Sequence, residues 1–570
     1  MSRVALRQSI HSGPPKGLLW LLVSVVALLS LLPSLRLLVT ALLDWQQGSN
    51  SSLWRVLHTP STWTALCHSL YTSGLGTLLS LLLGSLFAFS LGLTDIRCRS
   101  LWVFLFMLPM MIPPQVTALS WLQLFGPGSI ILNSLGMAPG FGSANPLYSP
   151  EGIALLLGIQ HAPLVFLALR TQLQCLPKEH IEAARLNGAS LWRVFFDIVL
   201  PLCRTALWAG AAIAFVSALG NFGIPAMLGI PVSYFVLPIQ IYQSLSSFGP
   251  SMLSDVAALS VLMGVLAVSI VSLQGIMQRR HALPLPGMAA RALDFQLGKW
   301  RLATEIALGA VLFVILIAPL LALIATSLVP ALGVPLNGQT LTFAAWQAIF
   351  DSQSATWRAL TNSMALSVAA ALVLMSLSLP LAWLQVRYAS RPLRWLQNAI
   401  DIPYTLPGVV LAIAVILLFS RPLPLLNVSL SGTLTIIFIA YLARFLTICL
   451  KPVHNSMLQL DPSMEEAASL AGASVSQRLY HIVLPLLAPA AFAGALLVFL
   501  TAVNELTVSA LLWSAGNETL GVVIFNLDES GNKVLASAIS VLVVALIILV
   551  MLLLSGLGRV LGKGVIPWQN

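Results

Sequence analysis

Charged side chains are scarce in this sequence of 570 residues. Asp, Glu, Lys and Arg together make up only 8% of it, whereas hydrophobic residues make up 58%. The mean hydropathy is +0.94. A water-soluble domain needs about a quarter of its residues charged, so this composition excludes an ordinary soluble protein. We therefore predict an integral membrane protein.

Paired cysteines and nucleotide-binding lysines are also lacking. The chain contains no C-x-x-C pair, so neither a zinc site nor a disulfide framework is indicated, and we predict no metal site and no cofactor bound by this chain. No lysine lies in a G-x-x-x-x-G-K-[ST] phosphate loop, which excludes ATP hydrolysis by that machinery. No set of catalytic residues is predicted either. The five isolated cysteines are Cys67, Cys98, Cys175, Cys203 and Cys449.

Long apolar runs are the main feature that is present. Each has the length of roughly 18 to 25 residues that crosses a bilayer as a helix, and a helix satisfies its own backbone hydrogen bonds in lipid. We predict an all-α integral membrane protein with about 12 transmembrane helices, the first being a retained anchor because it is too long for a cleavable signal. The runs are Leu18–Leu43, Leu66–Leu93, Leu101–Phe125, Gly152–Leu173, Leu202–Leu228, Leu253–Met277, Leu302–Val329, Leu360–Val386, Trp395–Phe419, Gly432–Leu450, Leu486–Trp513 and Val534–Leu557.

The distribution of basic residues predicts the orientation. With both termini in the cytoplasm, only Arg55, Arg358, Arg421 and Lys533 of the 28 Lys and Arg residues fall on the outer side, and Arg36 lies within the first span. The remaining 23 fall on the cytoplasmic side, as the positive-inside rule requires. The net charge of +10 is therefore explained by a bacterial inner (plasma) membrane with anionic lipid, and no nucleic acid is needed as a partner.

One polar segment occurs twice between the apolar runs. The sequence EAARLNGASLWRVFFDIVLP begins at Glu182, and EAASLAGASVSQRLYHIVLP begins at Glu466, which is 284 positions later. In both copies Glu-Ala-Ala is followed at the same distance by a glycine, Gly188 or Gly472, and then by Ile-x-Leu-Pro. This repetition predicts two equivalent polar hairpins.

The spans around these segments repeat as well. LPMMIPP from Leu108 parallels IPYTLPG from Ile402, and FVSALGNFGIPAML from Phe215 parallels FLTAVNELTVSALL from Phe499. Six spans in each half is an even number, so the halves enter the membrane in the same direction as parallel repeats. We predict a first repeat at 1–277 with its loop at 174–201, a cytoplasmic linker at 278–300, and a second repeat at 301–570 with its loop at 451–485.

Local patterns suggest how the hairpins are built. Ser463 stands three residues before Glu466, as in a capping box, so a short helix is predicted to begin there. It is expected to end near Gly472, because glycine relieves the backbone at a turn. A second short helix should then lead to Pro485. Each hairpin would form a rigid knob.

The repeated pattern EAA, three residues, G, nine residues, I-x-L-P resembles the cytoplasmic loop of permease subunits in binding-protein-dependent ABC importers. The resemblance covers almost the whole chain. It implies that each loop docks on one of two copies of a cytoplasmic ATPase subunit, which would bind the ATP and Mg²⁺. It also implies an extracytoplasmic solute-binding protein. The implied docking residues are Glu182, Ala183, Ala184, Gly188, Glu466, Ala467, Ala468 and Gly472.

The fused form resembles the ferric-iron permeases, and thiamine and phosphonate permeases have a similar architecture. NFGIPAMLG from Asn221 and NEL from Asn504 resemble segments of the ferric group, so ferric iron is the candidate substrate and thiamine, phosphonate or another small solute the alternative. An ion-coupled secondary transporter and a non-transporting scaffold or receptor are rival classes.

Residues of the translocation path are expected near Asn221, Asn504 and Glu505. A charge within the eleventh span would be costly in lipid, so Glu505 should face the bundle interior, where it either lines the path or pairs with a basic neighbour. His161 is expected to be a packing residue of the fourth span. Prolines such as Pro113 and Pro407 should kink the third and ninth spans.

Overall fold

The computed structural model describes residues 16–45, 48–140, 142–176, 178–247, 251–281, 295–351, 354–388, 391–422 and 427–561. These residues are mostly helical and form no β-strand, and the one isolated bridge among them joins Thr94 to Phe295. The predicted all-α class is confirmed. Most of the predicted linker, residues 282–294, lies outside the described residues, as do both chain ends.

The first half of the chain, residues 16–281, contains helices of very different lengths. Its longest members are apolar enough to span a bilayer, and its short members lie between them. They are α1 (Lys16–Val26), η2 (Ala27–Leu31), α2 (Leu32–Trp45), η3 (Gly48–Asn50), α3 (Ser52–His58), α4 (Pro60–Leu93), α5 (Arg99–Met111), α6 (Pro114–Phe125), α7 (Ile130–Ser134), α8 (Pro150–Gln174), α9 (Lys178–Leu186), α10 (Leu191–Val194), η4 (Phe195–Val199), α11 (Leu200–Leu219), α12 (Gly223–Gly229), η5 (Ile230–Val232), α13 (Leu237–Leu245) and α14 (Met252–His281).

The second half, residues 295–561, follows a similar order. Its helices are η6 (Gly298–Trp300), α15 (Arg301–Leu312), η7 (Phe313–Ile317), α16 (Ala318–Thr326), α17 (Ala344–Ile349), α18 (Ala355–Arg387), α19 (Arg391–Thr405), α20 (Gly408–Phe419), α21 (Leu434–Gln459), α22 (Ser463–Leu470), α23 (Val475–Arg478), η8 (Leu479–Val483), α24 (Leu484–Val503), α25 (Ser509–Leu512), α26 (Leu520–Glu529) and α27 (Lys533–Leu561).

By length and composition, ten helical segments of the described chain can each cross a membrane unbroken, and three further pairs are bent by more than 40°. Two of these bent pairs occupy the positions predicted for the third and ninth spans, so together with the ten they account for the predicted twelve. The third bent pair, Gly223–Val232 with Leu237–Leu245, was not predicted.

The third and ninth spans are broken rather than continuous. Between α5 and α6 the chain turns by 98°, and between α19 and α20 by 109°. The breaks fall at Pro113 and Pro407, which precede the new helices with extended ψ angles of 139° and 141°. A proline lacks the amide hydrogen and its ring collides with the preceding turn, which explains why one helix cannot continue through either position.

The fifth and eleventh spans are shorter than predicted. The expected ends were Leu228 and Trp513, but α11 ends at Leu219 and α24 ends at Val503. Short separate helices, α12 and α25, follow each break. Glu505 therefore lies at a helix break and not within a continuous span, which corrects the prediction.

Four π-helical turns interrupt otherwise continuous helices, and each precedes a proline by two residues or fewer. Because a proline cannot donate to the carbonyl four residues earlier, the wider π turn accommodates it without ending the helix. The hairpins are thus continuous with the following spans, as Leu191–Leu219 and Val475–Val503, whereas separate short helices were predicted. The turns are η2, η4, η7 and η8, and the prolines are Pro33, Pro201, Pro319 and Pro485.

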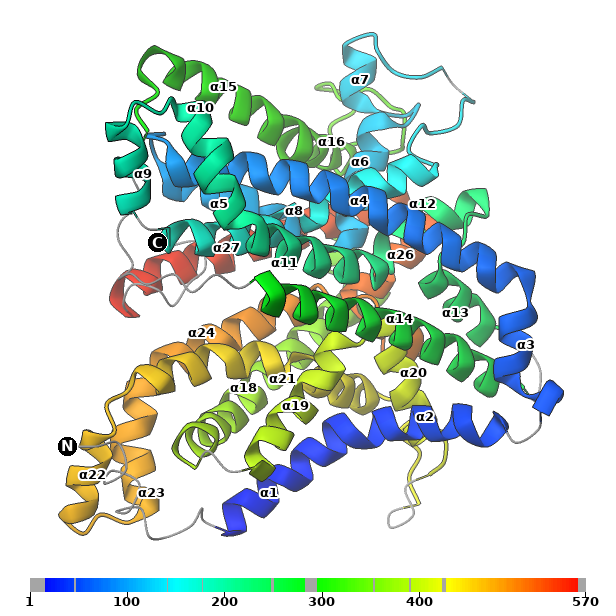
Figure 1. Ribbon diagram of the computed structural model, residues 1–570. Coiled ribbons are helices and arrows are strands. Elements are labelled where there is room, and N and C mark those ends of the chain that lie inside the picture. The colour runs from blue at the N-terminus through cyan, green and yellow to red at the C-terminus, as the bar shows by residue number, and fades with distance from the viewer. Residues whose placement is uncertain are drawn as a thin grey trace.

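The first helices of the two halves are exchanged. In the first half, α2 packs against α20 of the second half, and in the second half α16 packs against α6 of the first. Figure 1 shows α1 and α2 along the edge formed by α19 and α20, while α15 and α16 lie on the opposite edge. Each half therefore completes the packing of the other.

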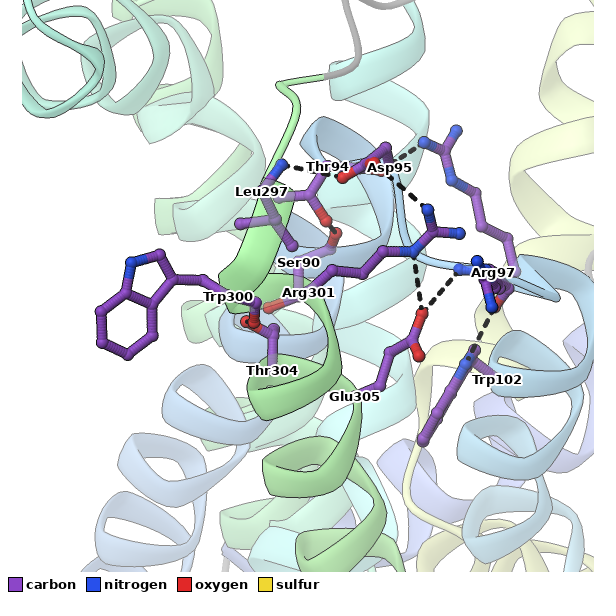
Figure 2. Close-up of polar contacts among 11 residues, drawn as sticks. Ser90, Thr94, Asp95, Arg97, Trp102, Leu297, Trp300, Arg301, Thr304 and Glu305 are labelled. Carbon is purple, nitrogen blue, oxygen red and sulfur yellow. Dashed lines mark hydrogen bonds and ion pairs between the residues drawn. The ribbon is translucent and has the colours of Figure 1, made fainter.

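The entry into the second half is held against the first half by polar contacts (Figure 2). The carboxylate of Asp95 accepts a hydrogen bond from the Leu297 amide at 2.9 Å and pairs with Arg301 at 3.4 Å. Glu305 pairs with Arg301 at 3.3 Å and accepts from the Arg97 amide at 3.0 Å. This polar cluster of Asp95, Arg97, Leu297, Arg301 and Glu305, here called the entry clamp, fixes where the exchanged helix begins.

Candidate functional site

The two repeated polar segments form matching hairpins, α9–α10 and α22–α23, which project from the same end of the helix bundle (Figure 1). Glu182 and Ala183 are exposed in the first hairpin. In the second, Ala467 is exposed and Glu466 is half-buried. Ala184 and its counterpart Ala468 are also half-buried, on the sides of the helices that face the protein.

Both predicted glycine turns are present. Gly188 has a φ of +81° and Gly472 a φ of +87°, in the left-handed region where glycine carries no Cβ penalty. The amide of Ala189 donates to the carbonyl of Ala184 at 3.0 Å, and the repeat-equivalent amide of Ala473 donates to Ala468 at 3.0 Å. This six-to-one hydrogen bond is typical of the Schellman motif that ends a helix. The motif requires the left-handed glycine four residues after the alanine whose carbonyl accepts, which explains the constant distance between the two in both copies.

The capping box lies at a different place from the one predicted. Ser463 is the first residue of α22, and its amide donates to the side chain of Asp461 at 2.9 Å. The box is formed by Ser474 and Gln477 at the start of α23, with hydrogen bonds of 3.3 and 2.8 Å. Ser190 caps α10 with its hydroxyl alone, which accepts from the amide of Arg193 at 3.3 Å. The cap therefore begins the second helix of each hairpin.

Two leucines at the tips of the hairpins were missed by the sequence reasoning. Leu186 and Leu470 are 89% and 91% exposed, and they occupy equivalent positions 284 residues apart. Each is the last residue of its helix, two positions before the turn glycine. The repeat therefore places the same exposed apolar side chain at the tip of each hairpin. Comparing the two copies for shared apolar residues could have found it.

The two hairpins differ in how they are anchored. Glu465 is buried beneath α22, where its carboxylate accepts from Nε1 of Trp383 at 2.8 Å and pairs with Nε of Arg387 at 2.7 Å. The repeat-equivalent residue in the first hairpin is Ile181, which is buried and apolar. The second hairpin is thus attached by charge and the first by hydrophobic packing.

The structure brings the three predicted path residues together. Asn221, Asn504 and Glu505 line one cavity of about 550 Å³ between the two halves. The cavity is bounded by the ends of α11 and α24 and by the breaks of the third and ninth spans. His161 also lines it, with Nδ1 2.8 Å from the carbonyl oxygen of Leu157 in its own helix.

Glu505 is paired inside this cavity. Its Oε2 lies 3.5 Å from Nε of Arg444 on α21, and its Oε1 accepts from the amide of Val508 at 2.8 Å. Glu505 therefore has the basic neighbour that was one of its two expected roles, and it also lines the cavity. At the positions equivalent by repeat, the first half has Asn221 for Glu505 and Gln160 for Arg444. The ion pair belongs to the second half alone.

Pseudo-equivalent contacts join the halves across the cavity. The side-chain amide of Asn504 donates to the carbonyl of Met111, where α5 ends. Its counterpart Gly220 lies against the ring of Pro407, since a Cβ on Gly220 would be 3.3 Å from the Pro407 Cβ. In both cases the end of the fifth span of one half meets the proline break of the other.

Other cavity residues were not foreseen. Arg444, Lys451 and Gln115 all line the cavity. Arg444 and Lys451 are two helical turns apart on α21, and both were assigned only to the count of cytoplasmic basic residues. Arg444 could have been found from its position, because it lies within an apolar span and a charge there needs a partner. Glu505, in the same half of the chain, is an acidic residue in an equally apolar segment.

Comparison with known families finds two matches along the chain. The family described as "Binding-protein-dependent transport system inner membrane component" matches residues 76–283 and again residues 387–566. Each matched segment contains one of the hairpins.

Individual relatives agree with this result. A putative ferric transport system permease protein, FbpB 1 of Haemophilus influenzae, is 26% identical over 85% of this chain and 76% of its own length. The ferric transport system permease protein FbpB of Actinobacillus pleuropneumoniae is 26% identical over 91% of this chain and 75% of its own. The molybdenum transport system permease protein ModB of Escherichia coli is 32% identical, over 34% of this chain and 83% of its own.

Proposed function

This chain belongs to the family of binding-protein-dependent transport system inner membrane components, in a form that fuses two such units, and we propose that separate ATPase subunits drive solute through the cavity between its halves. The chain is an import permease of the inner membrane, and its family works with an ATPase and a solute-binding protein. The coupling of this chain to ATP hydrolysis is our proposal.

The observation that carries the proposal is the pair of matching hairpins at one end of the bundle. Each offers an exposed leucine at its tip beside small alanines, which suit a groove on a rigid partner. Two hairpins imply two copies of the ATPase subunit, which would hold ATP and Mg²⁺. Because each hairpin is continuous with a long span, a displacement at its tip reaches the cavity through one helix.

The proposed orientation follows from the same hairpins. If they face the cytoplasm, both chain termini lie on that side too, and the basic residues gather there next to anionic lipid. The opposite end of the bundle, which includes α3 and α7, would then receive the solute-binding protein (Figure 1). We propose ferric iron as the cargo, because two relatives that align along both halves are ferric transport permeases. Thiamine, phosphonate or another small solute is the alternative.

Co-purification with the ATPase tests the coupling. The full-length chain would be co-expressed with a candidate ABC ATPase subunit from the same genome, and the variants Leu186→Glu and Leu470→Glu would be compared with Leu135→Glu. Leu135 is 64% exposed directly after α7, on an element separate from both hairpins, so it is a matched control. We expect each hairpin variant to reduce the bound ATPase, the double variant to abolish it, and the control to retain it.

Transport by the reconstituted complex tests the cargo and the need for ATP. Proteoliposomes containing the chain, the ATPase and the binding protein should take up radioactive iron only with ATP and with an intact Leu186 and Leu470. Retention of the ATPase by the double variant, or uptake by the chain alone driven by an ion gradient, would contradict the proposal.

A further inference from the structure

The cavity between the halves carries an excess of positive charge. Its lining, among the described residues, contains the cations Arg444 and Lys451 and one carboxylate, Glu505. Glu505 is already engaged, because one of its oxygens faces the Arg444 guanidinium and the other accepts from the Val508 amide. A carboxylate held in this way is a poor ligand for an incoming cation.

The two cations retain binding capacity. Nη1 of Arg444 is buried and has no hydrogen-bond partner in the protein, although Nε of the same guanidinium faces Glu505. The ammonium group of Lys451 lies 5.0 Å from the centre of the Tyr404 ring. Arginine offers several N–H groups in a planar fork that matches the oxygens of carboxylates and phosphates.

Uncharged polar groups beside them are also unsatisfied. Gln115 is 1% exposed, lines the cavity, and has no hydrogen-bond partner at either its amide nitrogen or its amide oxygen. A methyl group on Gly521 would lie 3.1 Å from the Gln115 amide nitrogen and 3.3 Å from the backbone carbonyl oxygen of Glu505, so the Gln115 donor lies near the main chain at the break after α24. A buried amide without partners is costly, and a ligand that accepts its hydrogen bond removes part of that cost.

The first-half residues at the positions of the Arg444–Glu505 pair are satisfied, unlike Gln115 of the same half. Gln160, the repeat equivalent of Arg444, donates to the carbonyl of Ile112 at 2.9 Å and accepts from Thr117 at 3.0 Å. Asn221, the repeat equivalent of Glu505, accepts from the amide of Ile224 at 3.1 Å. The unsatisfied donors are thus Nη1 of Arg444 in the second half and the amide of Gln115 in the first.

From this arrangement we infer that the cavity binds the anionic oxygens of its cargo, with Arg444, Lys451 and Gln115 as the donors. The cargo would therefore be an oxyanion, a phosphonate or a carboxylate, and iron would cross as an anionic chelate and not as a bare cation. This inference rests on the proposed function, since it assumes that solute passes through the cavity.

Binding to the purified full-length chain in lipid nanodiscs tests the inference without any ATPase. The probes would be molybdate, methylphosphonate, citrate and ferric citrate, with hexaamminecobalt(III) as a trivalent cation that presents no anionic group. The variants are Arg444→Gln, which introduces the residue found in the first half, together with Lys451→Gln and Glu505→Gln. Arg421→Gln, in an exposed loop outside the cavity lining, is the control for net charge.

We expect at least one anionic probe to bind and the cobalt complex not to bind. Loss of one charged donor should weaken anion binding by about tenfold in both Arg444→Gln and Lys451→Gln. Glu505→Gln should tighten it by roughly threefold, because a glutamine oxygen can still accept from Val508 while Arg444 is released. The identity of the probe that binds then separates a free oxyanion from a metal chelate.

A purely structural role for the ion pair predicts a different result, in which Arg444→Gln and Glu505→Gln both lower the unfolding temperature and both weaken binding. That result, preferential binding of the cobalt complex, or an equal effect of Arg421→Gln would overturn the inference. If the chain does not bind anions, the ATPase can still co-purify with it. If the Leu186 and Leu470 variants retain the ATPase, the purified chain can still bind anions. The two proposals can therefore be tested separately.

Discussion

Glu465 and Arg387 form an ion pair beneath the second hairpin, with Oε1 of the glutamate 2.7 Å from Nε of the arginine. Both side chains are largely buried, and Trp383 donates a further hydrogen bond to the same carboxylate. The pair joins α22 to the end of α18. Any force that reaches the second hairpin is therefore shared between its own span and α18.

Neutralising Glu465 should loosen the second hairpin and leave the first unchanged. Breaking a buried pair by removing one partner costs about 3 kcal/mol, because the other charge stays buried. Glu465→Gln is expected to increase amide hydrogen exchange in α22, while exchange in α9 stays at the wild-type rate. The neighbouring substitution Glu466→Gln is the matched control, and equal exchange in the two variants would refute the role given to Glu465.

The hairpins should also respond unequally to matched substitutions of their motif glutamates. Glu466 is half-buried and next to the anchored Glu465, whereas Glu182 is fully on the surface. We expect Glu466→Ala to reduce ATP-dependent uptake more than Glu182→Ala does. The physical basis of this asymmetry is the charged anchor that Glu465 forms with Arg387 and Trp383. Equal losses of uptake would contradict it.

The fold was predictable because its signals are local and repeated. Apolar runs, basic loops and the turn glycines each act over a few residues, and the second copy of the repeat checks the first. The breaks at Pro113 and Pro407 were predicted only as kinks. A proline prevents a helix from continuing regularly, but it does not set the angle between the two helices that it separates. The pairing of Arg444 with Glu505 joins two residues 61 positions apart in the numbering, and no local pattern specifies which charge faces which.

Both turn glycines should resist substitution. An alanine at Gly188 or Gly472 would hold a Cβ at a φ above +80°, which costs about 1–2 kcal/mol. We expect each variant to unfold its hairpin turn locally and to bind less ATPase. Gly275 within α14 is the control, since open space surrounds its Cβ position and alanine favours the helix interior. A tolerated alanine at both turns would show that the left-handed geometry is dispensable.

Gly408 should be needed for the position of Arg444. A Cβ on Gly408 would overlap Nη1 of Arg444, so alanine must displace the guanidinium from the break before α20. We expect Gly408→Ala to lower anion binding and uptake to the level of Arg444→Gln. Gly264→Ala is the control, because its Cβ would make only ordinary contacts at 3.6 Å or more with Leu406 and Val410. Wild-type binding by Gly408→Ala would exclude the proposed position of the guanidinium.

The entry clamp should depend on pH through Asp95. The Leu297 amide, which donates to its carboxylate, and the nearby Arg301 hold the pKa of Asp95 below its ordinary value of 3.8. A group with a lowered pKa in the folded state stabilises the protein above its unfolded-state pKa, and this contribution is lost as the pH falls through the folded-state pKa. The clamp is therefore expected to be intact at pH 7 and to weaken only below about pH 4.

Asp95→Asn isolates this contribution from those of the other carboxylates. The unfolding temperature of wild type should exceed that of Asp95→Asn at pH 7, and the difference should shrink as the pH falls through the folded-state pKa of Asp95, because the wild-type side chain then becomes uncharged like asparagine. Arg301→Gln should show the same narrowing, since its partner is neutral at the lower pH. A difference between wild type and Asp95→Asn that stays constant while the pH falls through the folded-state pKa of Asp95 would mean that the charge of Asp95 does not hold the exchanged helix in place.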